Sequence, residues 1–423
     1  DGCRPCFYSQ KRNESDGIGW TRANATNVSY FMNVYPRNYQ PIYSHLNKNT
    51  SDDPIKDDLL ESPNKVTHTE PGSMISSAEA SPIVDTTQSE KILPHKKKIS
   101  IRIDTANHKQ TKQTKNNKDV RYHYTLTFTI EFPHNNDTCF IGYFYPYPYT
   151  LMKDHFKEII SKPVYSNIFK QELMCHTLAG NRCDLITITN FESREDEIKE
   201  RSVIVLSGRV HPGETNSSWA MKGIIDELIN DSDTSIELRN RYVFKLIPML
   251  NPDGVLYGNN RCSLIGVDLN RHYINPIFRL TPTIQSYKKL INHLSNECNL
   301  YLIADIHGHS RLKNIVSYGI DMETSFHMNK QKDVTSFKKR SKLFDHYLSK
   351  DYNHIINRYQ LFPYLLSNNL PNIFSFNNSS WNLGGKIKEG TARVVFWKEF
   401  DIQNTFTIEI TFMGSDISSD MNG

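Results

Sequence analysis

Alternation of apolar and polar residues marks the first ordered region of the chain. Residues 124–132 alternate strictly and place aromatic and aliphatic side chains on one face, as expected of a strand with one wet side. Residues 139–144 form a second strand that we expect to pair back onto the first, and residues 17–44 contain further short strands. The pattern predicts a small all-β domain at residues 17–148.

The composition changes inside this region, between about residues 47 and 118. Ser, Asn, Asp, Lys and Pro dominate there, and aromatic residues are almost absent. Such a segment buries too little apolar surface to offset the entropy lost on ordering it. We therefore expect a disordered insertion whose basic clusters, at residues 95–98 and 112–118, are solvated rather than bound to an acidic partner.

After about residue 149, helices and strands are predicted in alternation. Short β-branched apolar runs, typical of buried parallel strands, occur at residues 185–189, 202–207, 243–250 and 300–306. Helices are predicted at residues 151–161, 217–230 and 283–298, and closing strands at residues 393–400 and 405–412. We predict an α/β domain at residues 149–414, with a mixed sheet, helices on both faces and a polar insertion at about residues 321–355.

Composition excludes several classes of protein. The 423 residues carry 50 Lys and Arg against 46 Asp and Glu, a balance that does not favour a nucleic-acid partner. No apolar run approaches the roughly 18 residues of a membrane span, and no signal-peptide pattern opens the chain. The seven cysteines are scattered, which favours a reducing compartment, and Cys3 and Cys6 are best explained as incidental thiols. We expect a monomeric cytoplasmic protein and, because the sequence begins with Asp1, a fragment of a longer one.

Three candidate metal ligands lie where predicted strands end. His211 and Glu214 stand three residues apart in the turn after residues 202–207, so both side chains can reach one cation. His307 follows the apolar run at residues 300–306, with a glycine next to it. Ligands of open α/β sheets collect beyond the carboxyl ends of the strands. The three residues therefore make a His2Glu set for one Zn²⁺, with one position left open.

Two alternatives compete with this metal site: His211 and Glu214 could be an accidental pair, and His309 could be the third ligand. A chain with 16 histidines contains His-x-x-Glu pairs by accident, so His211 and Glu214 alone favour the chance explanation. His309 competes with His307 as the third ligand, although a hydrogen-bonding role beside the ligands suits it better. The position of these residues at strand ends, together with the partner residues described next, favours a metal site over a chance pair.

Glu409 is a candidate base in the alternating strand at residues 405–412. It shares a strand face with three threonines, so it could simply face water from an edge strand. Alternatively it faces the metal, takes a proton from water and returns that proton to a leaving amine. The residues by themselves leave both alternatives open.

Side-chain donors suited to a carboxylate lie between the two metal segments, at Arg261, Asn270 and Arg271. Arginine grips a carboxylate through two parallel hydrogen bonds, and Asn270 adds a donor beside it. Single arginines usually lie on the surface, so this inference depends on the metal site. Together the residues predict a substrate that ends in a carboxylate.

Taken together, these segments resemble the cytosolic carboxypeptidases, the deglutamylating branch of the zinc carboxypeptidase A superfamily. The resemblance runs from about residue 19 to 414, apart from the two insertions. It rests on the motifs at residues 209–219, 251–254, 261–264, 268–271, 307–311 and 406–409. The chain departs from the usual pattern at Val267, His272, Tyr273 and Ala392, which leaves every ligand in place and affects only the shape of the substrate pocket.

The resemblance implies a role for each candidate residue. His211, Glu214 and His307 correspond to the ligands of one zinc ion, and Glu409 corresponds to the catalytic base. The residues that bind the terminal carboxylate and polarise the scissile carbonyl correspond to Arg261, Asn270 and Arg271. Arg393 corresponds to the basic residue that pairs with the side chain of a C-terminal glutamate, with an ordinary strand-end arginine as the alternative.

The resemblance also implies a fold, a substrate and a location. Residues 17–148 would form a β-sandwich domain packed on a zinc carboxypeptidase domain at residues 149–414. The substrates would be polyglutamylated tubulin or other glutamate-rich protein C-termini, which implies a cytoplasmic, microtubule-associated enzyme. We predict a zinc metallocarboxypeptidase that hydrolyses C-terminal residues, glutamates above all.

Two other functions stay open. An amidohydrolase that deacylates N-acyl amino acids would use the same kind of site, but the β-rich N-terminal region and Arg393 argue against it. A non-catalytic module that binds tubulin tails would be expected to have lost Glu409 or His307, and both are present.

Overall fold

The computed structural model describes residues 5–36, 98–101, 122–321, 358–382 and 388–415. The chain separates into two compact units, one made of residues 1–23 and 134–423 and the other of residues 24–133. The predicted polar insertion at residues 321–355 lies outside the described residues, apart from Asp321. Most of the predicted disordered insertion also lies outside them.

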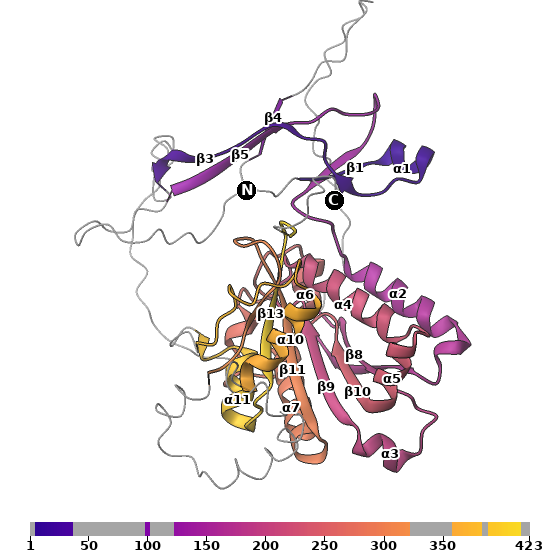
Figure 1. The fold of residues 1–423 in the computed structure, drawn as a ribbon. Coiled ribbons are helices and arrows are strands. Elements are labelled where there is room, and N and C mark those ends of the chain that lie inside the picture. The colour runs from indigo at the N-terminus through magenta and orange to yellow at the C-terminus, as the bar shows by residue number, and fades with distance from the viewer. Residues whose placement is uncertain (1–4, 37–97, 102–121, 322–357, 383–387, 416–423) are drawn as a thin grey trace, which may run out of the picture. The chain divides into compact units, whose positions relative to one another are not determined.

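A seven-stranded mixed sheet forms the centre of the larger unit, in the order β12-β13-β11-β9-β10-β8-β7 (Figure 1). The strands are β7 Phe169–His176, β8 Arg182–Ile188, β9 Ser202–Gly208, β10 Tyr242–Ile247, β11 Leu300–His309, β12 Val316–Tyr318 and β13 Thr405–Thr411. The four central strands β13, β11, β9 and β10 run parallel. The α/β class and the mixed sheet are confirmed.

β8 corrects one detail of the prediction, because it runs antiparallel to β10 rather than parallel. β8 also runs antiparallel to β7, with which it forms a hairpin, so the parallel part of the sheet ends at β10.

Helices cover both faces of the sheet, as predicted. Helices α2 (Tyr149–Ser161) and α4 (Thr215–Leu228) pack with Ile186 and Leu246 in one buried cluster. Helices α7 (Pro282–Glu297) and α11 (Ala392–Phe400) pack with Leu185 and Ile303 in a second cluster. The described part also contains α3 (Glu195–Glu200), α5 (Asp233–Arg241), α6 (Pro252–Leu256) and α10 (Leu361–Asn369). Among the described helices, none combines the length and apolar character needed to cross a membrane.

The strand predicted at residues 393–400 is wrong, because these residues belong to α11. Two consecutive valines and a phenylalanine favour a strand locally. In the structure the segment is buried on nearly every side, so its sequence has no helical period. Phe396 packs edge-on against Tyr273 and Tyr287, with ring centroids 5.4 and 5.1 Å away, and this tertiary packing outweighs the low helix propensity of valine.

Two small antiparallel sheets include the remaining strands. In one, β1 (Cys6–Ser9) pairs with both β2 (Thr21–Arg22) and β6 (Cys139–Gly142). In the other, β5 (Tyr122–Thr129) pairs with β3 (Thr26–Pro36) and β4 (Lys98–Ile101). Strands are therefore present where residues 17–44 and 124–132 predict them. β4, however, lies inside the segment predicted to be disordered.

The predicted pairing of residues 139–144 with residues 124–132 is wrong, since β6 pairs with β1 instead. The reason lies in Asp137, which precedes β6. Its carboxylate accepts hydrogen bonds from the side chain of Ser9 and from the backbone of Lys11, the latter at 3.0 Å. Ser9 also caps the short helix α1 (Gln10–Asp16), which the sequence did not predict. A single β-sandwich domain at residues 17–148 stays a prediction.

Candidate metal centre and active site

The loop after β9 carries two of the candidate ligands, and Arg209 fixes its shape. Arg209 adopts the left-handed conformation, with φ of 57°. Its buried guanidinium donates to the carbonyl of Pro212 at 2.7 Å and to the hydroxyl of Ser218 at 2.9 Å. These bonds tie the loop to α4 and position His211 and Glu214.

The structure brings His211, Glu214 and His307 together, with one ligand atom of each within 4.8 Å of the others. The Glu214 carboxylate lies 2.7 Å from Nδ1 of His211 and 3.0 Å from Nδ1 of His307. The rival, His309, does not belong to this group. Its Nδ1 instead accepts a hydrogen bond from the backbone of Leu312 at 3.3 Å, in agreement with the hydrogen-bonding role expected of it.

Two aspartates orient the histidine rings from behind. Nε2 of His211 lies 3.0 Å from Asp268 Oδ1, and Nε2 of His307 lies 2.7 Å from Asp305 Oδ2. Asp305 is itself held by the buried hydroxyl of Ser207 at 2.7 Å. A carboxylate on the far nitrogen fixes the tautomer of a metal-binding histidine and makes its other nitrogen a better ligand.

The donor chemistry of this cluster fits a zinc ion. With Nε2 of His211 and His307 donating to aspartates, the two Nδ1 lone pairs face each other at 3.2 Å beside a carboxylate. Burial disfavours charge on His307, but Asp305 and Glu214 outweigh it and raise the pKa of this imidazole well above its usual range. A ring nitrogen that would hold a proton this firmly is also well suited to bind a metal cation. Two imidazoles and one glutamate are the ligands of many catalytic zinc sites.

Glu409 faces the metal cluster rather than an open edge of the sheet. β13 lies between β11 and β12, and Glu409 is the register partner of His307 on β11. Register partners on neighbouring strands project to the same face of a sheet. Burial raises the pKa of the Glu409 carboxyl to about 7, against the opposing charge of His307, which suits a group that exchanges protons near neutral pH.

The three residues predicted to bind the substrate carboxylate also lie next to the cluster. Arg261 donates through Nε to Asp268 at 2.9 Å, so one aspartate holds both this arginine and His211. The amide nitrogen of Asn270 lies 3.2 Å from Nε2 of His307. Arg271 donates to the carbonyl of Asn270 at 2.9 Å. The short segment from residue 268 to 271 therefore packs directly against the metal ligands.

Arg393 lies at the start of α11 and is only 2% exposed. It donates to the carbonyl of Gly319, and no described carboxylate forms an ion pair with it. Two neighbours that the sequence prediction missed add to this environment. Nζ of Lys388 lies 4.6 Å above the ring of Tyr318, and both burial and the charge of Arg393 lower the pKa of Lys388.

Sequence signals for the missed residues existed, although they were weak. Asp305 precedes His307 by two positions on one strand, which places both on the same face. Asp268 stands two residues before Asn270, and Lys388 lies in the motif that contains Arg393. Nothing local marks Arg209 as the anchor of the loop, because its partners become neighbours only in the folded chain.

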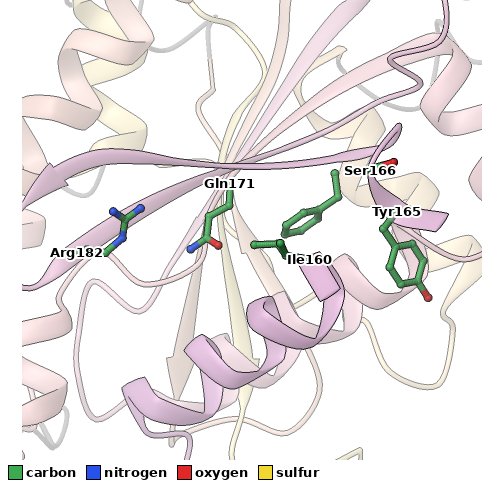
Figure 2. Close-up of a pocket in the computed structure, with 6 residues that line it drawn as sticks. Ile160, Tyr165, Ser166, Gln171 and Arg182 are labelled. Carbon is green, nitrogen blue, oxygen red and sulfur yellow. The ribbon is translucent and has the colours of Figure 1, made fainter. Parts of the chain in front are cut away.

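A separate cavity of about 510 Å³ opens beside the edge strand β7, near the end of α2 (Figure 2). Its lining residues are Ile160, Tyr165, Ser166, Phe169, Gln171 and Arg182. Gln171 and Arg182 both donate to the buried carboxylate of Asp184, at 3.0 and 2.7 Å. None of the candidate site residues lines this cavity, so it is distinct from the metal centre.

Curated relatives share substantial identity with the chain. Mouse cytosolic carboxypeptidase 3 is 42% identical over 312 residues, which cover 73% of this chain and 28% of the mouse protein. Mouse cytosolic carboxypeptidase 2 is 41% identical over 313 residues, or 74% and 33% of the two chains. Cytosolic carboxypeptidase 1 of Xenopus laevis is 42% identical over 302 residues, or 70% and 23%. The chain thus spans between 23% and 33% of the length of these relatives.

A solved structure with a similar fold and a matching family model both concern carboxypeptidases. A metallo-carboxypeptidase from Burkholderia cenocepacia aligns with a TM-score of 0.51 at 20% identity, over 68% of this chain and 66% of that one. That likeness shows the fold. Residues 162–416 match the family described as zinc carboxypeptidase. The resemblance found in the sequence is confirmed, and the chain belongs to the zinc carboxypeptidase family.

Proposed function

We propose that this chain is a metallocarboxypeptidase that binds one zinc ion and removes C-terminal residues, glutamates above all, from acidic protein tails. The observation that carries the proposal is the convergence of His211, Glu214 and His307 within 4.8 Å, with Glu409 in register beside His307. Polyglutamylated tubulin is the substrate that this proposal favours. A cytoplasmic, microtubule-associated monomer is the corresponding setting.

In this proposal His211, Glu214 and His307 hold the zinc ion. When bound, zinc supplies Lewis acidity toward a carbonyl oxygen and toward water. Glu409 accepts the proton of the attacking water and delivers it to the nitrogen of the leaving amino acid. Its raised pKa of about 7 favours both transfers near neutral pH. Arg261 uses the N–H groups that Asp268 leaves free to stabilise the charge that develops on the carbonyl oxygen.

Positive charge supports a glutamate at the C-terminus of the substrate. Asn270 and Arg271 would bind the terminal carboxylate. Arg393 and Lys388 would face the side-chain carboxylate. The guanidinium of Arg393 has no carboxylate partner among the described residues, and burial together with its charge lowers the pKa of Lys388. An anionic side chain would relieve this repulsion, whereas an apolar one would leave a buried guanidinium with a single carbonyl partner.

Mass spectrometry of glutamylated tubulin peptides tests the proposal. The purified chain loaded with zinc should shorten the peptides by successive glutamates. Glu409→Gln should abolish shortening while the zinc content stays unchanged, because the amide cannot accept the proton. Turnover by the Gln variant would remove Glu409 from the assigned role, and release of apolar C-terminal residues alone would refute the glutamate preference.

The same samples separate the two rival functions. Hydrolysis of N-acyl amino acids with no action on peptides would favour an amidohydrolase. Binding of glutamylated peptides by zinc-loaded protein, with no product from either substrate class, would favour a non-catalytic module. Glu409 is present and in register with His307. A retained catalytic base supports an enzyme over a module that only binds peptides.

A further inference from the structure

Two cysteines that the proposed reaction does not use face each other across the β7–β8 hairpin. Cys175 and Cys183 are register partners, and both are free thiols. Residues directly opposite each other in antiparallel strands have Cα atoms about 4.5 to 5.5 Å apart. That separation lies within the roughly 4.4 to 6.8 Å that a disulfide spans. We propose that Cys175 and Cys183 form a peroxide-sensitive dithiol that closes into a cross-strand disulfide.

Both side chains lie on the same side of the sheet. Cys183 belongs to the buried cluster under α7, and Cys175 packs against that cluster. The thiol of Cys175 lies close enough to that of Cys183 for the two to shift each other's pKa, and Ser286 of α7 also lowers the pKa of Cys175. Register and direction thus both favour a bond between the two sulfur atoms.

The register shifts between Leu173 and Cys175, but from Cys175 to the turn the two strands pair without interruption. At its turn, the backbone N–H of Thr177 donates to the carbonyl of Asn181 at 2.8 Å. The side chains of both residues donate to the carboxylate of Asp253, at 2.5 and 2.8 Å. Asp253 lies in α6, outside the hairpin, so the turn is anchored to the rest of the domain. A fixed register keeps Cys175 opposite Cys183.

The two thiols differ in the way that a reactive pair requires. Cys183 is fully buried, and the neighbouring Cys175 thiol together with burial raises the pKa of the Cys183 thiol. Cys175 is only partly buried, and the neighbouring Cys183 thiol lowers the pKa of the Cys175 thiol despite burial. Oxidants react with the more exposed and more acidic thiol first. Cys175 is therefore the attacking residue and Cys183 the resolving one.

The chemistry balances with one equivalent of hydrogen peroxide. The Cys175 thiolate attacks one peroxide oxygen, the O–O bond breaks, and the departing hydroxide takes up a proton to become water. This leaves a sulfenic acid on Cys175. The sulfur of Cys183 then attacks that of Cys175, the S–O bond breaks, and a second water leaves with the Cys183 proton. The two sulfurs lose two electrons, and both peroxide oxygens end as water.

Thiol titration and peptide mapping test the proposal. The native, zinc-loaded chain is treated first and then unfolded in denaturant, so that the buried thiol of Cys183 is also counted. After treatment with hydrogen peroxide, the number of titratable thiols should fall by two. The fragment that links residues 175 and 183 should be lighter by two hydrogen atoms, and dithiothreitol should restore both values. Because glutamate release is measured separately, failure here leaves the proposed function untouched.

Matched variants decide between this pair and other cysteines. Cys175→Ser should prevent the loss of two thiols, and Cys298→Ser, which removes a partly buried cysteine elsewhere in the domain, should not. The Cys175→Ser variant keeps the buried Cys183 and its hydrogen bond to the carbonyl of Met249 at 3.4 Å, so the core contact of the hairpin is retained. A disulfide to any other cysteine, or oxidation of Cys175 to a sulfinic acid without a bridge, would overturn the proposal.

Discussion

Asp305 shows how much a single buried side chain can contribute to a metal site. It is 1% exposed, and its two carboxylate oxygens are used by His307 at 2.7 Å and by Ser207 at 2.7 Å. The contact with His307 is made to Nε2, whereas Nδ1 of the same ring faces Glu214. Asp305 therefore acts on the proposed ligand set through the orientation and basicity of His307.

We predict that Asp305→Ala weakens zinc binding about 10- to 100-fold, the usual cost of losing a carboxylate behind a ligand histidine. Competition against a chromogenic chelator measures the affinity. Asp226→Ala is the matched control, since it removes the carboxylate that lies 2.6 Å from His155, outside the metal cluster. Unchanged zinc affinity in a folded Asp305→Ala protein would show that His307 needs no such support.

Arg393 determines selectivity rather than turnover in the proposed site. We predict that Arg393→Ala reduces the ratio of kcat/KM for glutamate-terminated over alanine-terminated peptides by about 10- to 100-fold. The expected loss is one charge-assisted hydrogen bond, worth about 1.5–3 kcal/mol. Lys398→Ala, near the other end of α11, should leave the ratio unchanged. Because folding defects lower both rates together, an unchanged ratio for Arg393→Ala would count against its role.

The junction between β11 and α4 depends on a glycine next to a ligand. A Cβ atom at Gly308 would lie 2.1 Å from Oδ1 of Asn216, whose amide donates to the carbonyl of Ile410 at 2.6 Å. Gly308 itself donates through its backbone to Glu214 at 2.9 Å. Close packing of helix against strand is therefore part of what positions the metal ligands.

We predict that Gly308→Ala lowers the free energy of unfolding by about 1–3 kcal/mol, the range for overpacking a filled site. Thermal unfolding followed by circular dichroism measures the shift. Gly223→Ala is the control, because a Cβ there meets no atom within 4 Å and the residue lies exposed inside α4. That change should stabilise the chain by about 0.5–1 kcal/mol. Equal effects of the two substitutions would contradict the packing argument.

Ligand binding should be visible in the stability of the folded chain. The facing Nδ1 atoms of His211 and His307 and the Glu214 carboxylate come together only after β9, α4 and β11 have packed. Their ligand atoms are therefore assembled in the folded state alone, and zinc binds that state preferentially.

We predict that a strong chelator lowers the unfolding midpoint and that added zinc restores it. At a free zinc concentration 100 times Kd, the stabilisation is about 2.7 kcal/mol. Differential scanning calorimetry measures the shift, and His307→Ala should remove the response to zinc. A midpoint that ignores both chelator and zinc would contradict the proposed metal site.

Short-range patterns were sufficient to predict the elements that carry the candidate ligands. The apolar runs that become β9 and β11 end where His211, Glu214 and His307 begin, and both features are visible within about ten residues of sequence. The same holds for the amphipathic helices α4 and α7. The prediction for α11 failed because nearly complete burial removes the alternation of apolar and polar residues that marks a helix. The prediction for β6 failed because its pairing partner, β1, is distant in the sequence.

The sequence by itself determined the kinds of side chain available for chemistry and the strand ends at which they occur, because side-chain type and local periodicity are properties of neighbouring residues. Only the tertiary structure decided what lies behind and beside them. Asp268 and Asp305 become supports of the histidines, and Glu409 faces the cluster because β13 is enclosed between β11 and β12. Cys175 meets Cys183 through strand register. These relations depend on which segments pack together, which no stretch of the chain encodes alone.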